Sequence, residues 1–428
     1  MPADLFADLT WRALVAQTTG DGALGSWLAA KPRTLYAGFD PSADSLHVGH
    51  MLPLMMLRRF QKAGHKPIPL VGGATGMIGD PTGKSEERNL LSLEALRANV
   101  AGIEKQLRQF LSFEGPSAAI LLNNFDWMSK FSYLDFLRDV GKHFPVNVML
   151  AKDSVSSRID RESGISYTEF SYMLLQAYDF VYLHRHHGCE LQIGGSDQWG
   201  NITAGIDLAR RMHGVQLHGI TCPLLLKSDG TKMGKSEKGA IFLSPARTSP
   251  YAFYQYWINV ADADAGTCLR FLTELPREEI EALDDSRAKE PHLRASQKRL
   301  AEWLTQLVHG DAGLAAAQRA TDIFFGAEIE NLSDAQLSEI FADVPSKELP
   351  GSKLDGQGLA LSEAFREAGL VASNSEFRRL FEQGGCYVNN RKCDNVNARI
   401  TWMDLAGRKV LLLRAGKKKY AVLRFSRA

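Results

Sequence analysis

The sequence lacks long apolar runs and paired cysteines. Its 428 residues contain no uninterrupted apolar stretch of about eighteen, the length that a membrane-spanning helix needs. The 5 cysteines form no Cys-X-X-Cys pair, so we expect neither a zinc site nor a redox motif. The N-terminal residues MPADLFADLTWRALVAQ also lack the basic start and apolar centre of a targeting signal. These absences predict a cytoplasmic protein without membrane spans.

The sequence also lacks an excess of charge of one sign, because 50 Lys and Arg residues nearly balance 49 Asp and Glu residues. The balance is uneven along the chain. From Lys353 to the end there are 15 basic and 7 acidic residues, a net charge of +8, which leaves −7 for the rest of the +1 total. A basic C-terminal segment indicates attraction to a polyanion such as nucleic acid, with a solvated charged surface as the alternative.

The length exceeds what one hydrophobic core usually organises, so two or three domains are expected. From Thr34 to Leu226, short apolar runs bounded by glycine alternate with stretches of helical period. The strand candidates are TLYAGF, PIPLVGG, AAILLNN, ELQIGG and PLLL. This alternation predicts an α/β domain with a Rossmann-like parallel sheet, and its ligands belong at the carboxyl ends of the strands.

Helical patterns dominate after Ser249, with YAFYQYWINV and the stretch from REEIEALDD onward. Around ADVPSKELPGS the period is lost and Pro, Gly and Ser increase, which is typical of a connector. We therefore predict four parts: a Rossmann-like domain over 1–248, a helical domain over 249–331, a connector over 332–352 and a small α+β domain over 353–428.

The first chemically informative stretch is YAGFDPSADSLHVGHMLPLMMLRRF, residues 36–60, which reads as a strand, a polar turn and a helix. A helix N-terminus offers unpaired N–H groups and a positive dipole end to a phosphate. His47 and His50 share one helical face there, and Gly49 lets a nucleotide approach the backbone. For either histidine alone, a structural role is the alternative. HVGH resembles the HIGH signature of class I aminoacyl-tRNA synthetases, with Val48 in place of isoleucine.

The second stretch is TKMGKSEKG, residues 231–239, here called the lysine loop. The ammonium groups of Lys232 and Lys235 can stabilise negative charge on a departing pyrophosphate, although a solvated turn is the alternative. KMGKS resembles the class I KMSKS motif, with Gly234 in place of the middle serine. HVGH and KMGKS near opposite ends of one α/β domain are together far more specific than either motif alone.

The segment TEFSYMLLQAYDF places Tyr172, Gln176 and Asp179 on one helical face. A solvent-facing stripe would be the alternative. Together with YAGFDPSADSLHVGH, GDPTGKS and GGSDQWGN, the segment closely resembles bacterial-type tyrosyl-tRNA synthetases, and the resemblance extends from about Thr34 to the C-terminus. A phenol donates one hydrogen bond and accepts another, so a carboxylate and a hydroxyl together suit it, whereas phenylalanine would leave both unpaired.

The resemblance implies a role for each matching residue. Tyr36 and Asp179 would bind the substrate phenol; Tyr172, Gln176 and Asp80 would hold its ammonium group, with Gln192 beside them. The residues expected around ATP and the adenylate are Gly38, Asp40, Ser42, His47, Gly49, His50, Gly195, Asp197, Gln198 and Lys235. The groups expected to assist catalysis at the phosphates are His47, His50, Lys232, Lys235, Lys84 and Arg88.

The C-terminal segment resembles the S-four RNA-binding module. There, Arg378, Arg379, Arg391 and Lys392 are the expected contacts to RNA. The resemblance also implies a helical anticodon-binding domain over 249–331, and a homodimer whose interface includes an insertion over 124–161.

The sequence thus predicts an enzyme that activates tyrosine with ATP and transfers the tyrosyl group to tRNA(Tyr). Mg²⁺ is expected to enter with ATP through its phosphates, with no tightly bound cofactor. We predict no metal site at the histidines after Leu183, because no partnered ligand spacing accompanies them. The alternatives are a tryptophanyl-tRNA synthetase and a non-catalytic RNA-binding scaffold with a synthetase shell.

Overall fold

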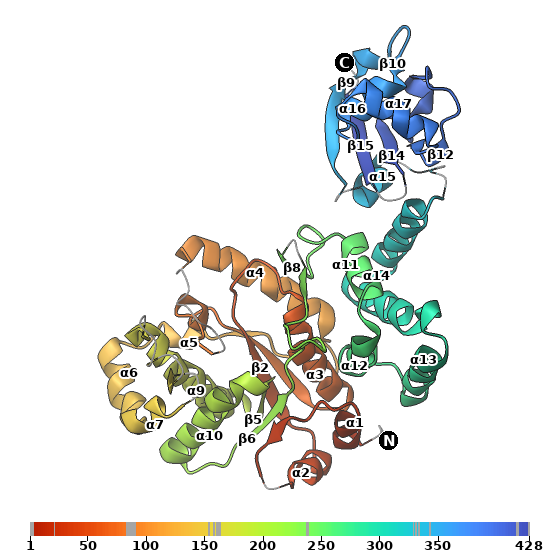
Figure 1. The fold of residues 1–428 in the computed structure, drawn as a ribbon. Helices are drawn as coiled ribbons and strands as arrows, with labels where there is room; N and C mark the ends of the chain where they lie inside the picture. Colours follow the sequence, from red (N-terminus) through yellow and green to blue (C-terminus); the bar gives the residue numbers. More distant parts are fainter. Residues whose placement is uncertain are drawn as a thin grey trace. The chain divides into compact units, whose positions relative to one another are not determined.

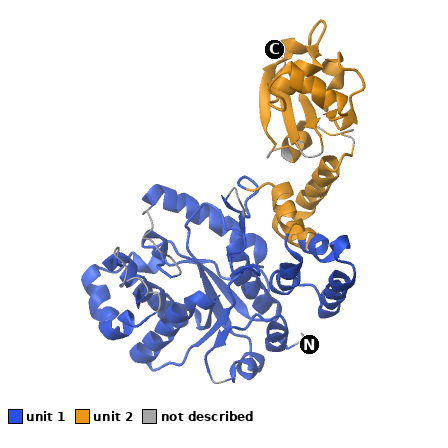
Figure 2. Cartoon of the chain, viewed as in Figure 1, with its two compact units in different colours: residues 1–247, 260–300 blue, residues 248–259, 301–428 orange. Residues whose placement is uncertain are grey.

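The computed structural model divides the chain into two compact units, which are coloured separately in Figure 2. Unit 1 comprises residues 1–247 and 260–300, and unit 2 comprises residues 248–259 and 301–428. The structure describes residues 4–20, 22–82, 91–152, 155–156, 159, 164–236, 239–327, 329, 332, 334–341, 344–416 and 419–426. None of the helices in these ranges is both long and apolar enough to span a bilayer.

A six-stranded sheet forms the centre of unit 1, in the spatial order β1-β6-β5-β2-β3-β4 (Figure 1). All neighbouring strands are parallel except β1, which pairs antiparallel with β6. In chain order the strands are β1 Gln17–Thr18, β2 Thr34–Phe39, β3 Lys66–Val71, β4 Leu122–Asn123, β5 Cys189–Gly195 and β6 His218–Cys222. The chain leaves the centre of the sheet in opposite directions after β2 and after β5, so a crevice opens at the carboxyl ends of these two neighbours.

Helices cover both faces of this sheet. α3 (Met51–Lys62) connects β2 to β3 and α10 (Trp199–His213) connects β5 to β6; right-handed crossovers in opposite directions put them on opposite faces (Figure 1). α9 (Tyr167–His187) packs along α10 and against β5. The remaining helices of unit 1 are α1 Leu5–Trp11, α2 Leu24–Ala30, α4 Leu93–Phe110, α5 Phe125–Met128, α6 Tyr133–Asp139, α7 Val146–Leu150, α12 Asp262–Leu272 and α13 Arg277–Lys289.

The predicted strands agree with this sheet except at one place. The run PLLL, residues 223–226, was expected to be a strand, but the strand is the preceding segment β6. Pro223 has no backbone N–H to give to a ladder, so the strand ends at Cys222. The apolar run instead lines the crevice beyond the end of the sheet.

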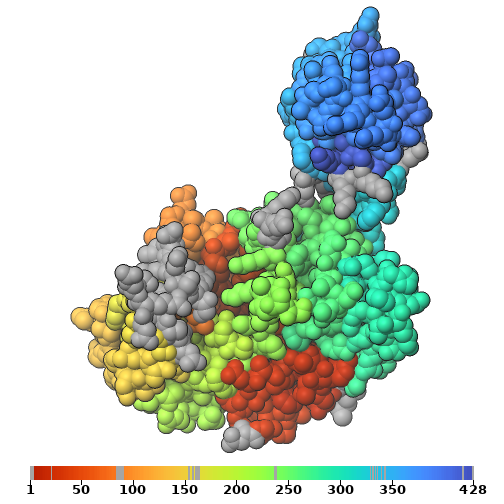
Figure 3. Space-filling view, in the orientation of Figure 1, coloured from red at the N-terminus to blue at the C-terminus, as the bar shows by residue number. Residues whose placement is uncertain are grey.

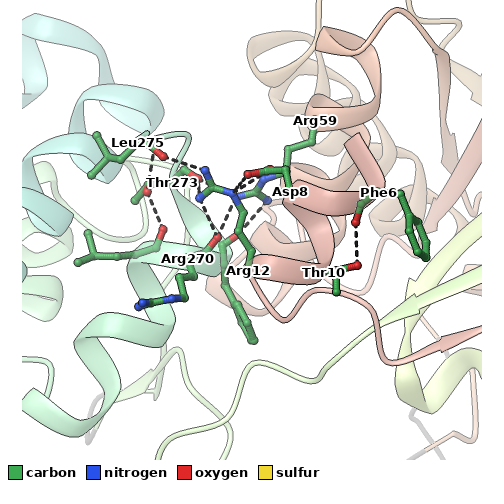
Figure 4. Close-up of polar contacts among 10 residues, drawn as sticks. Phe6, Asp8, Thr10, Arg12, Arg59, Arg270, Thr273 and Leu275 are labelled. Atoms are coloured by element: carbon green, nitrogen blue, oxygen red, sulfur yellow. Dashed lines mark hydrogen bonds and ion pairs between the residues drawn. The ribbon is translucent and has the colours of Figure 1, made fainter. Parts of the chain in front are cut away.

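Two buried arginines fasten α3 and α1 to the end of α12 (Figure 4). The guanidinium of Arg59 on α3 donates to the carbonyls of Phe271 at 2.9 Å and Thr273 at 2.6 Å. Arg12 donates to the carbonyl of Leu275 at 2.8 Å and forms an ion pair with Asp8. Burial, and then the neighbouring charge of Arg12, lower the pKa of Arg59 to about 9. The last carbonyls of α12, which have no partner within the helix, are satisfied in this way.

Unit 2 contains α11 (Pro250–Ile258) and most of α14 (Ala295–Phe324), which is interrupted at Gly310 by a backbone φ of 70°. The end of α14 is bound to the C-terminal sheet. The buried side chain of Asn390 donates to the carbonyls of Ile323 at 2.6 Å and Ala327 at 2.8 Å. Asn390 therefore closes the helix terminus from a buried position.

The sheet of unit 2 has the order β12-β11-β14-β15-β9. Its strands are β9 Ser346–Pro350, β11 Cys386–Val388, β12 Arg391–Lys392, β14 Val410–Ala415 and β15 Lys419–Ser426, and a separate pair is formed by β10 Leu359–Ala360 and β13 Arg399–Ile400. The accompanying helices are α15 Asp334–Ile340, α16 Leu361–Glu367 and α17 Asn374–Glu382. The stretch 332–352, interpreted from sequence as a connector, thus contains α15 and β9, and β9 pairs in parallel with β15.

Candidate active site

A cavity of about 400 Å³ lies at the carboxyl ends of β2 and β5 in unit 1. Its walls also include the N-terminus of α3, one face of α9 and the lysine loop. All the residues that the sequence predicts around tyrosine and ATP line this cavity, and so do Lys232 and Lys235. Lys84 and Arg88, the remaining predicted phosphate contacts, lie outside the described residues.

Two buried polar side chains form what is here called the floor of the cavity, the carboxylate of Asp179 and the phenol of Tyr36. Asp179 accepts hydrogen bonds from Asn124 Nδ2 at 3.0 Å and Trp127 Nε1 at 2.8 Å. Burial raises the pKa of Asp179 to about 7 against these hydrogen bonds, which act to lower it. Burial, and then the charge of Asp179, raise the pKa of Tyr36, which therefore stays protonated.

The Tyr36 hydroxyl is buried and has no hydrogen-bond partner among the described residues, and the same holds for Oε1 of Gln192. A buried polar atom without a partner costs free energy that a bound ligand can recover. One wall of the cavity therefore presents a hydroxyl, a carboxylate and an amide oxygen to whatever binds there.

A chain of hydrogen bonds runs from this floor to the next carboxylate. Asn124 Nδ2 also donates to Thr75 Oγ1, and the Thr75 hydroxyl donates to Asp40 at 2.7 Å. The Tyr172 hydroxyl donates to the other oxygen of Asp40 at 2.8 Å. The positions of Asp40, Tyr172 and Asp179 are thus coupled through fixed side chains.

A second polar group is built on Gln198. Its Nε2 donates to Asp80 at 2.7 Å, and its Oε1 accepts from Gln176 Nε2 at 3.1 Å. Asn201 on α10 holds Gln176 in turn, at 2.9 Å. Asp80 and Gln176 therefore face the same space from different parts of the chain, as acceptors for a cationic or N–H-bearing ligand group.

The two histidines form the turn that begins α3. Gly49 N donates to Nδ1 of His47 at 3.0 Å, and His47 N donates to Nδ1 of His50 at 3.1 Å. Because both Nδ1 atoms accept, the proton of each neutral ring lies on Nε2, where it can be donated to a ligand. Burial, and then Lys235, lower the pKa of His47. A Cβ at Gly49 would come within 2.8 Å of the His47 ring, so any other residue there would have to displace that ring.

The lysine loop lies directly beside the histidines. Val48 N donates to the carbonyl of Ile241 at 2.9 Å, and Leu243 N donates to the carbonyl of Leu46 at 2.8 Å. The space-filling view shows the green segment around residue 240 against the red-orange segment around residue 50 (Figure 3). Burial, and then the charge of Asp80, raise the pKa of Asp197, and the charge of Lys232 acts to lower it. The two cationic side chains therefore act on the same cavity as the histidines.

Four of these residues were not predicted from the sequence: Thr75, Asn124, Trp127 and Asn201. Asn124 directly follows β4, so the position of polar residues after parallel strands could have indicated it. Trp127 lies inside the segment predicted to be a dimer insertion, and only its contact with Asp179 identifies it.

The remaining predicted groups lie elsewhere. Arg378 and Arg379 are exposed on α17, and Arg391 and Lys392 are exposed on β12 of unit 2. His184 lies in the last turn of α9, and its Nδ1 is 3.0 Å from the carbonyl of Cys189. The described residues include no group of three or more His, Cys, Asp or Glu side chains placed to hold a metal ion.

Comparison with known proteins shows the family of the chain. The family model described as tRNA synthetases class I (W and Y) matches residues 29–326, and that described as the tyrosine–tRNA ligase SYY-like C-terminal domain matches residues 336–423. The tyrosine–tRNA ligase of Rhodopirellula baltica is 61% identical over 98% of this chain and 96% of its own length. That of Geobacillus stearothermophilus is 48% identical over 99% of this chain and 100% of its own length.

Solved structures show the same fold. A C-terminally truncated mitochondrial tyrosyl-tRNA synthetase of Aspergillus nidulans superimposes with a TM-score of 0.68 and 31% identity, over 74% of this chain and 93% of that one. The first family model covers tryptophan and tyrosine enzymes alike, whereas the C-terminal model and these relatives are specific to tyrosine. The chain therefore belongs to the tyrosyl-tRNA synthetase family of the class I aminoacyl-tRNA synthetases.

Proposed function

We propose that this chain carries out both steps of the family's reaction at the cavity described above. In the first step, the tyrosine carboxylate attacks the α-phosphate of ATP and pyrophosphate leaves. In the second step, a ribose hydroxyl at the end of tRNA(Tyr) takes the tyrosyl group and AMP leaves. The observation that supports this most directly is that one cavity combines a buried hydroxyl–carboxylate pair with two histidines and two lysines.

In this proposal the substrate phenol lies between Tyr36 and Asp179. The phenol donates to the carboxylate and accepts from the Tyr36 hydroxyl, which lacks a partner within the described residues. Phenylalanine would leave both groups unpaired in a buried site. The indole of tryptophan has an N–H donor but no acceptor, so it would leave the Tyr36 hydroxyl unsatisfied.

The substrate ammonium group would bind Tyr172, Gln176 and Asp80, which meet through the hydrogen bonds around Gln198 and Asp40. This arrangement gives the cation two carboxylates nearby without a metal. It also directs the tyrosine carboxylate away from the floor and toward the N-terminus of α3. Positioning of this kind supplies much of the rate in a reaction between two bound substrates.

The ATP phosphates would lie between residues 46–50, here called the histidine segment, and the lysine loop. Nε2–H donors of His47 and His50 and the ammonium groups of Lys232 and Lys235 would stabilise the negative charge that develops on pyrophosphate. Gly38, Ser42, Gly195 and Asp197, which line the same cavity, would bind the rest of the nucleotide. We propose that Mg²⁺ arrives as part of the ATP substrate, held through the phosphates.

We further propose a homodimer formed through the segment between β4 and α9. Large apolar side chains are exposed there on unit 1; among the described residues they are Phe125, Tyr133, Leu134, Val146, Val148, Leu150 and Ile159, and Tyr167 follows at the start of α9. Apolar side chains clustered in this way are typical of an interface, and a second copy is the usual partner. The enzyme would act in the cytoplasm, where tRNA is charged. Sedimentation of the purified chain as a monomer at micromolar concentration would contradict the dimer.

Lys235→Ala should slow tyrosyl-adenylate formation more than about tenfold, because it removes a charge that acts only as pyrophosphate leaves. The dissociation constant for tyrosine should stay unchanged, because Lys235 acts on His47 and is not among the residues proposed to bind tyrosine. Single-turnover rates with saturating ATP provide the measurement. Lys227→Ala, which removes a lysine outside the cavity, is the control. Equal rates for Lys235→Ala and the control would contradict the proposed role of Lys235.

Tyrosine binding should weaken as the pH falls below about 7. The pKa of Asp179 is raised to about 7. The ionised carboxylate accepts the hydrogen bond of the phenol directly, whereas the protonated carboxyl group would first have to lose its proton. Below that pKa the dissociation constant should rise toward about tenfold per pH unit, and above it the constant should level off. Equilibrium binding measured between pH 6 and 7.5 tests this. In Asp179→Asn the dependence should vanish; if it persists there, another group is responsible.

The double variant Arg378→Glu with Arg379→Glu should raise KM for tRNA at least about tenfold, because two phosphate-facing charges are reversed. Adenylate formation should remain at the wild-type rate, because α17 belongs to unit 2 and the cavity to unit 1. Charging assays over a range of salt concentration provide the measurement, with a shallower salt dependence expected for the variant. An unchanged KM for tRNA would exclude this face of α17 from RNA binding.

A further inference from the structure

The lysine loop is anchored at Met233 and Gly234, which are buried, whereas the side chains of the flanking Lys232 and Lys235 are exposed. This is the reverse of a simple surface turn, in which the middle residues would project into solvent. The anchored pair Met233–Gly234 therefore fixes the backbone positions from which the side chains of Lys232 and Lys235 extend.

Gly234 packs against the histidine segment with no space for a side chain. A Cβ at this position would lie 2.8 Å from Cβ and 3.0 Å from Cγ1 of Val48. Val48 is completely buried, so it cannot move aside into solvent. The backbones are also joined on both sides, because Ile241 N donates to the carbonyl of Gly234 at 2.8 Å and Val48 N donates to that of Ile241 at 2.9 Å.

Met233 packs in the opposite direction, against α12. Its sulfur lies 3.4 Å from Sγ of Cys268, which is also buried, and its backbone N–H donates to the carbonyl of Leu225. α12 holds the chain before the loop as well, since Asp264 accepts from Ser228 N at 2.7 Å. The same helix is fastened to α3 by Arg59. The centre of the loop is thus held between two elements that are themselves joined.

We propose that Val48 and Gly234 are a matched pair of positioning residues that sets the closest approach of the lysine loop to the histidines. They touch no substrate in this proposal; they act through Lys232 and Lys235, and the inference rests on the charge-stabilising role proposed above for these lysines. Val48 supplies the wall, and the absence of a side chain at Gly234 lets the loop backbone reach it. The same two positions are those at which HVGH and KMGKS depart from the HIGH and KMSKS signatures.

A double-mutant cycle tests the pair. Gly234→Ala should slow adenylate formation about tenfold or more, because the added Cβ must push the loop away from Val48. Val48→Ala removes Cγ1, one of the two atoms that the added Cβ would strike, and leaves only Cβ in its way, so the double variant should form adenylate at least about threefold faster than Gly234→Ala alone. The dissociation constant for tyrosine should be the same in the wild type, the two single variants and the double variant. A general loss of folded structure would instead raise it.

Gly230, just before the loop, provides a matched control. Its φ is +80° and that of Gly234 is +88°, but a Cβ at Gly230 would meet nothing within 4 Å. Gly230→Ala introduces the same backbone strain without the contact, so its adenylate formation should stay within about threefold of wild type and should combine additively with Val48→Ala.

The results of these experiments distinguish failure of the matched-pair proposal from failure of the role proposed for the lysines. Equal slowing by Gly230→Ala and Gly234→Ala would show that backbone strain is responsible, and additive effects of Val48→Ala and Gly234→Ala would show that the two residues act independently. Either result overturns the matched pair while leaving the lysine role intact. If Lys235→Ala left the rate of adenylate formation unchanged, the charge-stabilising role of the lysines, on which the pair depends, would be refuted.

Discussion

The tyrosine end of the cavity depends on holding one carboxylate inside the protein. Asp179 is almost fully buried, and an isolated carboxylate there would be expensive to keep ionised. Two donors from the segment after β4, Asn124 and Trp127, occupy one position on each of its oxygens. This leaves the carboxylate partly satisfied, with its pKa still raised to about 7, and ready to accept one further proton donor from a ligand. In the proposed function, the acceptor position that remains on Asp179 takes the hydrogen bond of the substrate phenol.

The same constraint extends through the rest of the site. Asn124 joins Asp179 to Thr75, Thr75 joins Asp40, and Asp40 joins Tyr172. The floor, the ammonium end and the carboxyl end of β2 therefore behave as one connected group of side chains. At the phosphate end the connections are made by the backbone instead, between the histidine segment and the residues that follow the lysine loop. The connections at the two ends of the cavity therefore differ in kind, through side chains at one end and through the backbone at the other.

Local sequence patterns were sufficient to predict the helices and strands whose apolar residues recur with a clear period. The strands β2, β3 and β5 and the helix α9 carry strong apolar patterns, and their chemistry-bearing residues follow from the rule that ligands bind where parallel strands end. β6 escaped prediction because HGITC is short and includes polar residues, whereas PLLL is more apolar but begins with proline. β9 escaped because only Leu349 among its residues is buried, and its pairing with β15 is a contact between distant parts of the chain. The hydrogen bonds of Asn124 and Trp127 are equally non-local, so no window of sequence contains them.

The pairing of β9 with β15 alters what counts as the C-terminal module. α15 and the last turn of α14 contribute Leu337, Phe341 and Ile323 to the same apolar cluster as Val410 and Leu412 of the sheet. Asn390 closes the end of that helix from within the sheet. A fragment begun at Lys353 would lose the edge strand β9 and about half of this apolar cluster. A module transferred to another protein must therefore include the C-terminal end of α14. The unit that folds starts well upstream of the residues that carry the charge.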